Sequence, residues 1–366
     1  MDSGLLASHF RNMSSKENTI ILYGSYGYTG RLIARECTAR GLQVILSGRK
    51  KEKLEKQSLE TGYPFEAVDL SNTVAVKKLL EKGSVLIHCG GPFQFTAKNM
   101  VEACVLTNTH YTDIAGEYQV FEMLAQYDLQ GKQSGITILP GAGFDVVPSD
   151  CLALYLKKAL PAARHLEIAF TLSQGGLSRG TAKTLVEGLG HGSVVRKEGK
   201  LVPVPLGKKI KEIDFGSFKS KCLNIPWGDI STAWHSTGIP NIEIYAAVNA
   251  SATMLAKASR YFNWLVRNRW VKDILLRRID KKADGPGLEK IHSTKSFLWG
   301  RVYDDAGNEA TATLETLSGY ALTAKTSVLI AEKILRGNFK TGYQTPASAY
   351  GPDLILEIEN TRRTAL

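Results

Sequence analysis

Thr19-Ile-Ile-Leu-Tyr-Gly-Ser-Tyr-Gly-Tyr-Thr-Gly30 is the stretch of sequence that decides the fold. Its apolar, β-branched beginning predicts a strand over residues 19–23. The residues that follow, 31–40, have the pattern of a helix, which Gly41 ends. A strand, a glycine-rich turn and a helix in this order are typical of the first unit of a nucleotide-binding α/β domain.

Three glycines in the turn have distinct expected roles. Gly24 allows a tight turn off the strand, Gly27 lets the backbone approach a pyrophosphate, and Gly30 permits close packing of the helix on the strand. The helix N-terminus would then face the phosphate charge. The alternative is an ordinary glycine-rich turn between strand and helix, but the flanking elements favour a Rossmann dinucleotide site.

The second predicted strand, Gln43–Gly48, indicates which dinucleotide binds. A site for NAD usually places an acidic residue here to hold the ribose 2′-hydroxyl, whereas this chain offers Ser47, Arg49, Lys50, Lys51 and Lys53. A guanidinium can bind a 2′-phosphate through two hydrogen bonds. We therefore predict NADP(H) as the cofactor; the alternative is that the cations only form the solvated start of a helix.

Further strand and helix patterns alternate up to residue 150, which predicts a doubly wound, mostly parallel sheet of the α/β class. Strands are expected near residues 65–70, 85–89, 111–114 and 136–140, with a helix beginning near Pro148. The predicted cofactor-binding residues are Gly24, Ser25, Tyr26, Gly27, Tyr28, Thr29, Gly30, Ser47, Arg49, Lys53, Asp69, Cys89, Gly90, Gly91, Pro92 and Phe93.

One large class of reductases is excluded. Short-chain dehydrogenases need a tyrosine with a lysine four residues later to move a proton, and no tyrosine of this chain has one.

The motifs together resemble the saccharopine dehydrogenase-like oxidoreductases, which include trans-acting enoyl reductase-like members. The resemblance rests on the segments 24–30, Ser47-Gly-Arg49, Cys89-Gly-Gly-Pro-Phe93, Tyr111-Thr-Asp-Ile-Ala-Gly-Glu117, 140–150 and 342–351. It implies NADP(H) as cofactor and a Rossmann domain with an inserted α+β domain and a C-terminal helix that returns to the first domain.

We expect four segments from this organisation: a flexible N-terminal tail (1–17), an NADP-binding Rossmann domain (18–160), a substrate and dimerisation domain (161–317) and a C-terminal return segment (318–366). In the second domain, strands are expected at 165–172, 241–248, 296–303 and 310–317, in an antiparallel sheet, and a helix is expected at 179–189. The helical pattern of 318–336 suits the return helix.

Hydride transfer also requires a proton donor or an oxyanion stabiliser. The candidates for this catalytic role are Asp145, Tyr118, Lys183, His191 and His235, each of which has a structural alternative as a capping, surface or loop residue. The family resemblance favours reduction of the C=C bond of an apolar, acyl- or polyketide-like substrate. A C–N dehydrogenase would need arginines such as Arg164, Arg179 or Arg196 near the nicotinamide, and a non-catalytic NADPH-sensing module would need none of these groups.

Composition indicates the expected charge distribution of the protein and its relation to membranes. The 366 residues carry a net charge of +11, and residues 1–150 hold 15 basic and 16 acidic side chains, so the excess lies in the second part. Residues 255–282 carry nine basic residues and two aspartates among aromatic residues, which indicates either a peripheral membrane contact or a core helix with a basic face. No apolar run is long enough to span a membrane.

The sequence also predicts which kinds of site the protein lacks and in which cellular compartment it is found. The five scattered cysteines indicate neither a disulfide framework nor a metal site and favour a cytoplasmic protein. No nucleic-acid-binding motif is present, so we expect a small-molecule substrate and a homodimer rather than a nucleic-acid partner.

Overall fold

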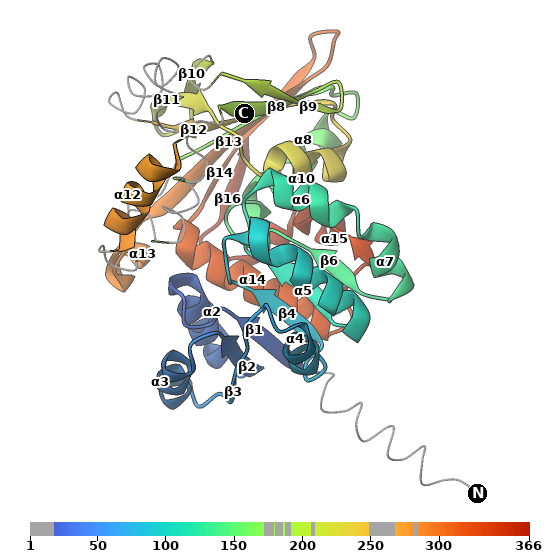
Figure 1. Cartoon of the computed structure of the whole chain (residues 1–366). Coiled ribbons are helices and arrows are strands. Elements are labelled where there is room, and N and C mark those ends of the chain that lie inside the picture. Colours follow the sequence, from blue (N-terminus) through green and yellow to red (C-terminus); the bar gives the residue numbers. More distant parts are fainter. Residues whose placement is uncertain are drawn as a thin grey trace, which may run out of the picture. The chain divides into compact units, whose positions relative to one another are not determined.

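The computed structural model describes residues 18–171, 179, 186, 192–205, 209–248, 268–280 and 285–366, and the chain divides into two compact units (Figure 1). Unit 1 contains residues 18–143 and 323–349, and unit 2 contains the described residues of 144–322 and 350–366. The expected tail, 1–17, lies outside the described residues, as do all but Arg179 and Val186 of the helix expected at 179–189.

Unit 1 is built on a seven-stranded sheet in the order β15-β6-β5-β4-β1-β2-β3, in which all neighbouring strands are parallel. The strands are β1 (Thr19–Tyr23), β2 (Gln43–Gly48), β3 (Phe65–Ala67), β4 (Val85–His88), β5 (His110–Asp113), β6 (Thr137–Leu139) and β15 (Gly342–Tyr343). The order 3-2-1-4-5-6 is that of the Rossmann fold, and β15 extends it by one strand. This confirms the predicted fold class.

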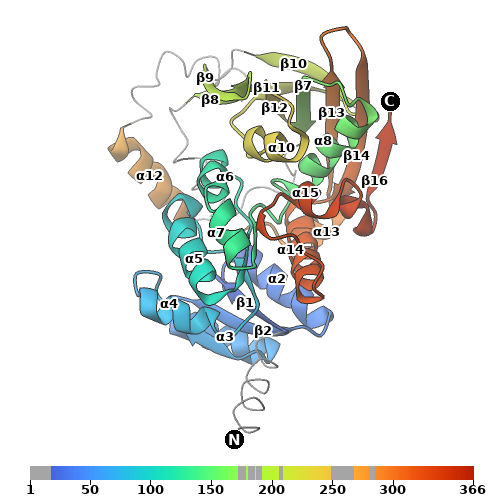
Figure 2. The same ribbon diagram turned by 90° about the vertical axis from the view of Figure 1, so that its right-hand side faces the viewer.

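Helices cover both faces of this sheet. They are α2 (Tyr28–Ala39), α3 (Lys51–Thr61), α4 (Thr73–Leu80), α5 (Phe93–Thr107), α6 (Tyr118–Ala125), α7 (Asp128–Gln133), α14 (Gly319–Leu335) and α15 (Pro346–Tyr350). Figure 2 shows α4 and α5 on one side of β1, and α2 and α14 on the other. The return helix α14 is fastened to α2 by an ion pair between Glu332 and Arg40.

The central strands explain why the sequence folds this way. Every residue of β1 and β4 is buried, and their sequences, TIILY and VLIH, are almost continuously apolar. Strands covered by helices on both faces require this composition, in contrast to the alternating pattern of a half-exposed strand. The core of unit 1 therefore lies around these two strands.

Unit 2 contains a nine-stranded sheet whose main order is β10-β11-β12-β7-β13-β14-β16, with β8 paired to β12 and β9 paired to β8. Its strands are β7 (His165–Phe170), β8 (Ser193–Lys197), β9 (Lys200–Val204), β10 (Ile210–Asp214), β11 (Lys219–Asn224), β12 (Asn241–Ala247), β13 (Lys295–Tyr303), β14 (Glu309–Leu317) and β16 (Arg362–Ala365). Its helices are α8 (Val147–Ala159), α10 (Asp229–Thr237), α12 (Arg269–Asp280), α13 (Leu288–Ser293) and the 3-10 helix η1 (Leu354–Glu357).

The sheet of unit 2 is mixed, whereas an antiparallel sheet was expected. Strands β7 and β12 pair in parallel, and the other pairs are antiparallel. Strands β8 to β11 were not predicted because they are short and because the frequent lysines of residues 197–221 hide their alternating patterns. Strand β16 was missed because it is a short, polar segment next to the C-terminus.

The division between the units differs from the expected boundaries at both ends. It falls at Gly143 rather than near residue 160, because α8 packs on β13 and β14 of the second sheet. Residues 350–366 join unit 2 because β16 pairs with β14, with Arg362 opposite Glu315. None of the helices described in either unit has the length and apolarity that a membrane crossing would need.

Candidate functional site

The loops that follow the strands of unit 1 gather at one edge of the sheet. Because all neighbouring strands are parallel, their carboxyl ends meet at that edge. Strands β1 and β4 are direct neighbours although β2 and β3 lie between them in sequence, so the order reverses at this point. Rossmann folds bind dinucleotides in the crevice above such a reversal.

The turn after β1 is tightly joined to its neighbours. Gly24 has a φ of 79°, and its N–H donates to the carbonyl oxygen of Ser47 over 2.8 Å. A Cβ atom at Gly24 would lie 2.8 Å from the peptide atoms that link Cys89 to Gly90. Only glycine allows this approach between the turn and the loop after β4.

Helix α2 begins immediately after this turn and leaves its N-terminus without a side-chain cap. Gly27 is the N-cap residue, and it has no side chain that could accept a hydrogen bond. Tyr28, Thr29 and Gly30 form the first turn of the helix. The helix therefore starts three residues earlier than predicted. The first N–H groups and the positive end of the helix dipole are what a phosphate group needs at this place.

Two predicted cofactor side chains have structural partners instead. The hydroxyl of Ser25 is buried and donates to Gln57 Oε1 over 2.8 Å, and Gln57 Nε2 donates back to the Ser25 carbonyl over 2.9 Å. The buried Ser47 hydroxyl donates to the Glu66 carbonyl over 2.8 Å and so ties β2 to β3. The sequence analysis missed Gln57, whose place in a charged helix gives no sign of burial.

A basic and aromatic cluster stands at the end of β2. A Cβ atom at Gly48 would lie 2.6 Å from Cε1 of Tyr26, so the tyrosine ring covers the end of the strand. The Lys53 Nζ lies 5.7 Å from the centre of that ring, and both Lys53 and Arg49 are exposed. The cluster consists of Tyr26, Arg49 and Lys53, and it offers two accessible cations beside the glycine turn.

Asp69 lies two residues beyond β3, near the same edge. Its carboxylate accepts hydrogen bonds from the N–H and the hydroxyl of Ser71, at 2.9 and 2.8 Å. These bonds, together with the charge of Arg49, lower the pKa of Asp69. The carboxylate is therefore ionised and fixed in a turn.

The loop after β4 contains Cys89, Gly90, Gly91, Pro92 and Phe93. Gly91 and Pro92 are exposed, and Phe93 is buried at the start of α5. Burial, with a further contribution from Asp113, raises the pKa of the Cys89 thiol. The thiol is thus protonated at neutral pH, so Cys89 is suited to shaping the loop rather than to acting as a nucleophile.

Asp113, at the end of β5, is a site residue that the sequence analysis did not single out. It is fully buried, and its carboxylate accepts hydrogen bonds from the Tyr111 hydroxyl (2.6 Å), Gly141 N–H (2.8 Å) and Ala115 N–H (3.0 Å). Burial raises the pKa of Asp113 to about 6, and the three hydrogen bonds oppose this shift. Asp113 thereby joins the loops after β5 and β6.

The five predicted catalytic candidates lie in different parts of the chain. Tyr118 is the first residue of α6 in unit 1, where burial raises its pKa, whereas Asp145 precedes α8 in unit 2. The Asp145 carbonyl accepts a hydrogen bond from Trp227 Nε1 over 2.9 Å. Lys183 and His191 lie outside the described residues, and His235 is in the last turn of α10.

A C–N dehydrogenase would require arginines near the nicotinamide. Two of the predicted arginines, Arg164 and Arg196, form ion pairs or hydrogen bonds within unit 2. The buried Arg196 donates to the carbonyls of Ile230 and Gly199, at 2.6 and 2.7 Å. Arg164 forms ion pairs with Glu198 and Asp305, at 3.2 and 3.0 Å. These two side chains therefore stabilise unit 2 itself.

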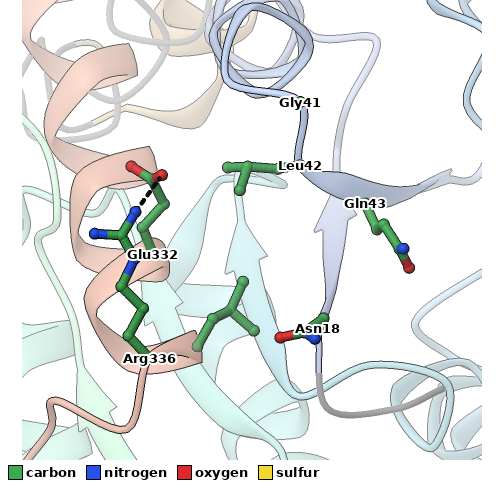
Figure 3. A pocket seen from close by; sticks show the side chains of 7 residues that line it. Asn18, Gly41, Leu42, Gln43, Glu332 and Arg336 are labelled. Atoms are coloured by element: carbon green, nitrogen blue, oxygen red, sulfur yellow. Dashed lines mark hydrogen bonds and ion pairs between the residues drawn. The ribbon is translucent and has the colours of Figure 1, made fainter. Parts of the chain in front are cut away.

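A small pocket elsewhere in unit 1 does not belong to this edge (Figure 3). Asn18 and Gln43, which line it, stand at the amino ends of β1 and β2, so the pocket lies at the opposite edge of the sheet. Glu332 of α14 and Arg336, which directly follows this helix, also line it and form an ion pair of 3.5 Å. The pocket is thus separate from the glycine turn.

The features at the carboxyl edge fit a phosphorylated dinucleotide: a glycine turn, an uncapped helix N-terminus and two exposed cations. Unit 1 is therefore a nucleotide-binding unit of the Rossmann class. Residues 20–139 match the family model of the saccharopine dehydrogenase NADP binding domain.

Several known proteins are similar to part of the chain. The chain is 28% identical to the human saccharopine dehydrogenase-like oxidoreductase, over 52% of either chain, so the match spans about half the length of this relative. It is 26% identical to a lipid droplet localized protein of Caenorhabditis elegans, over 49% of this chain and 48% of that protein. It is 28% identical to a trans-acting enoyl reductase of Mycobacterium tuberculosis, over 37% and 35%.

A solved structure shares the complete fold. Apo saccharopine dehydrogenase (L-Glu forming) from Saccharomyces cerevisiae superposes with a TM-score of 0.67 and covers 95% of this chain and all of that one, at 14% identity. The nucleotide-binding domain of the chain is thus an NADP-binding domain, and the solved structure shows a shared fold.

Proposed function

We propose that the protein is an NADP(H)-dependent reductase. The observation that carries this proposal is the cluster of Tyr26, Arg49 and Lys53 beside the Gly24 turn, because exposed cations there favour a 2′-phosphate. NADPH would supply the hydride. The chain would hold the pyrophosphate on α2 and the 2′-phosphate on Arg49 and Lys53.

We place the reaction at the C=C bond of an apolar, acyl- or polyketide-like substrate. The similarity to a trans-acting enoyl reductase and to a lipid droplet localized protein supports this class. Tyr118 is the candidate proton donor within unit 1; burial raises the pKa of its hydroxyl, which makes it a weaker acid than a free tyrosine. Asp145, Lys183 and His191 remain candidates for the same role.

The test combines cofactor binding with turnover. NADPH and NADH are titrated by fluorescence, and NADPH oxidation is followed by absorbance against enoyl thioesters, cyclic imines and 2-oxo acids with amino acids. We expect tighter binding of NADPH and turnover of an enoyl thioester. Turnover of an imine or a 2-oxo acid alone would establish the C–N alternative, and binding without any turnover would favour a non-catalytic module.

An Arg49→Glu variant is the sharpest arm of the same test. Reversing this charge should weaken NADPH binding about 10- to 100-fold and NADH binding much less, because only NADPH carries the 2′-phosphate. Lys78→Glu is the matched control, since Lys78 is an exposed cation on α4 of the same unit. Equal loss for both cofactors, or for both variants, would contradict the role of Arg49.

We also propose a peripheral membrane contact through α12, the described part of the basic segment 255–282. Trp270 is 70% exposed, and Ile274, Arg277 and Arg278 follow it at positions that share its side of the helix. Lys272 and Ile279 are buried on the opposite side. An exposed tryptophan flanked by arginines suits an interface with anionic lipid.

Vesicle flotation tests this contact. The protein should float with vesicles of phosphatidylcholine and phosphatidylserine and not with phosphatidylcholine alone. The double variant R277Q/R278Q should bind about 30-fold more weakly, since each of the two basic side chains near such a surface contributes about 1 kcal/mol. K197Q/K200Q removes two exposed charges from the same unit and serves as control; an equal loss with it would refute the assignment to α12.

A further inference from the structure

His88, the last residue of β4, has no role in the predicted site, yet its side chain is fully buried beside the Gly90 loop. The rings of Tyr23, Phe93 and Tyr111 surround it, with ring centres 5.7, 5.3 and 6.5 Å away. Burial lowers the pKa of His88 to about 3, so the imidazole is neutral at physiological pH. A neutral imidazole has one donor and one acceptor nitrogen.

The hydrogen bonds around His88 determine which nitrogen carries the proton. The N–H of Gly90 donates to Nδ1 over 3.4 Å, so Nδ1 is the acceptor and Nε2 carries the hydrogen. Nε2 lies 3.0 Å from the hydroxyl oxygen of Thr96, and that hydroxyl donates to the Gly90 carbonyl over 2.8 Å. The three bonds form a closed circuit that begins and ends at Gly90.

Gly90 is also held by contacts that leave no space for a side chain. A Cβ atom there would lie 2.9 Å from Cε1 of Tyr23 and 3.1 Å from Cε1 of His88. On its other side, the Cys89–Gly90 peptide is the group that the Gly24 turn touches. The orientation of this peptide therefore sets the position of the loop against which the phosphate-binding turn rests.

We infer that His88 and Thr96 are positioning residues for the cofactor site. Through the circuit they fix the Gly90 peptide and, with it, the relative placement of the two glycine loops at the ends of β1 and β4. This inference rests on the proposed function, since it assigns the circuit to binding of NADPH. The Thr96 hydroxyl is the essential link because it both accepts from Nε2 and donates to the Gly90 carbonyl.

The test compares Thr96→Val with Thr96→Ser. Valine keeps the shape of threonine but leaves Nε2–H and the Gly90 carbonyl without this partner, and we expect NADPH binding about 5- to 30-fold weaker. Serine restores the hydroxyl and should restore affinity to within about twofold. Thr112→Val is the matched control: it removes another buried hydroxyl bond, from Thr112 to the Leu86 carbonyl (2.7 Å), away from Gly90.

Nitrogen-15 NMR of labelled histidine adds a readout that a general loss of stability would not change. Wild type should show a protonated Nε2 and an unprotonated Nδ1 for His88, and Thr96→Val should shift both signals towards an averaged value. The inference is overturned if Thr96→Val binds NADPH as wild type does, if Thr112→Val loses as much affinity, or if Nδ1 carries the proton. Failure of wild type to bind NADPH would refute the proposed function instead, while the NMR result would still test the circuit.

Discussion

A Gly30→Ala variant is expected to lose NADPH binding at least tenfold and to unfold at a lower temperature than wild type. The added Cβ would lie 2.7 Å from the Ser25 carbonyl oxygen and 2.8 Å from the Ser25 Cα, and closer still to the Gly24 carbonyl oxygen. All three atoms belong to the backbone, so no rotamer change can relieve the clash.

A shift of the turn would be costly, because the turn is fixed on two other sides. Gly24 and Ser25 donate to the Ser47 carbonyl at 2.8 and 3.2 Å, and Gly24 packs on the Cys89–Gly90 peptide. Either α2 or the turn must therefore shift, at a cost of about 1–3 kcal/mol. The same shift would displace the helix N-terminus from its place opposite the phosphate.

Gly287→Ala is the matched control for this prediction. Gly287 precedes α13 with a φ of −64°, and a Cβ atom there meets no atom within 4 Å. Its melting temperature and NADPH affinity should equal those of wild type. If Gly30→Ala kept both properties as well, the close packing of α2 on the turn would be wrong.

An Asp229→Asn variant is expected to be more stable than wild type above pH 5, by a margin that grows with pH. Asp229 stands in the first turn of α10 and is fully buried, and neither of its carboxyl oxygens has a hydrogen bond that meets ordinary geometric limits. Burial, with the nearby Asp150 and Asp145, raises the pKa of Asp229 well above its ordinary value, and Ser149 opposes this.

The direction in which stability changes with pH follows from the protonation of Asp229 in the folded and the unfolded chain. The folded chain keeps Asp229 protonated, whereas the unfolded chain ionises it above about pH 3.9, so rising pH favours unfolding. The cost is about 1.4 kcal/mol per pH unit until the pKa of the folded state is reached. Asparagine is neutral in both states and similar in shape, so the substitution removes this cost.

Thermal unfolding followed by calorimetry between pH 5 and 8.5 measures the effect. Asp304→Asn is a control of opposite sign in the same unit, because hydrogen bonds from Asn308 and neighbouring N–H groups lower the pKa of Asp304. That variant should be less stable than wild type at neutral pH. A wild type whose stability rises in parallel with that of Asp229→Asn would show that Asp229 is ionised in the fold.

The Rossmann half of the fold could be predicted because its signals are local. The buried run of β1, the glycine turn and the start of α2 lie within one short stretch, and each residue type acts on its own neighbours. The charged strand β10 lacks such a signal, since Lys211 within it and Lys209 just before it pair with the distant Glu167 and Glu243. Pairing of this kind becomes visible only in the folded chain.

The residues of the candidate site could likewise be predicted only where their role depends on local spacing in the sequence. Its glycines act through the backbone and can be found from spacing, whereas Asp113 owes its role to Gly141, 28 residues later. Ser47 illustrates the opposite case, because its place at the end of β2 indicated a ligand contact and its hydroxyl bonds to Glu66 instead. No local pattern singles out the catalytic group, because its candidates Tyr118 and Asp145 belong to different units.

The route of the chain through the two units has a consequence for biosynthesis. The chain passes from unit 1 to unit 2 after Gly143, returns within α14, and leaves again after Ala349. The last strand of the nucleotide-binding sheet, β15, is therefore synthesised after almost all of the second sheet. Unit 1 can therefore complete its sheet with β15 only after the chain as far as Tyr343 has left the ribosome.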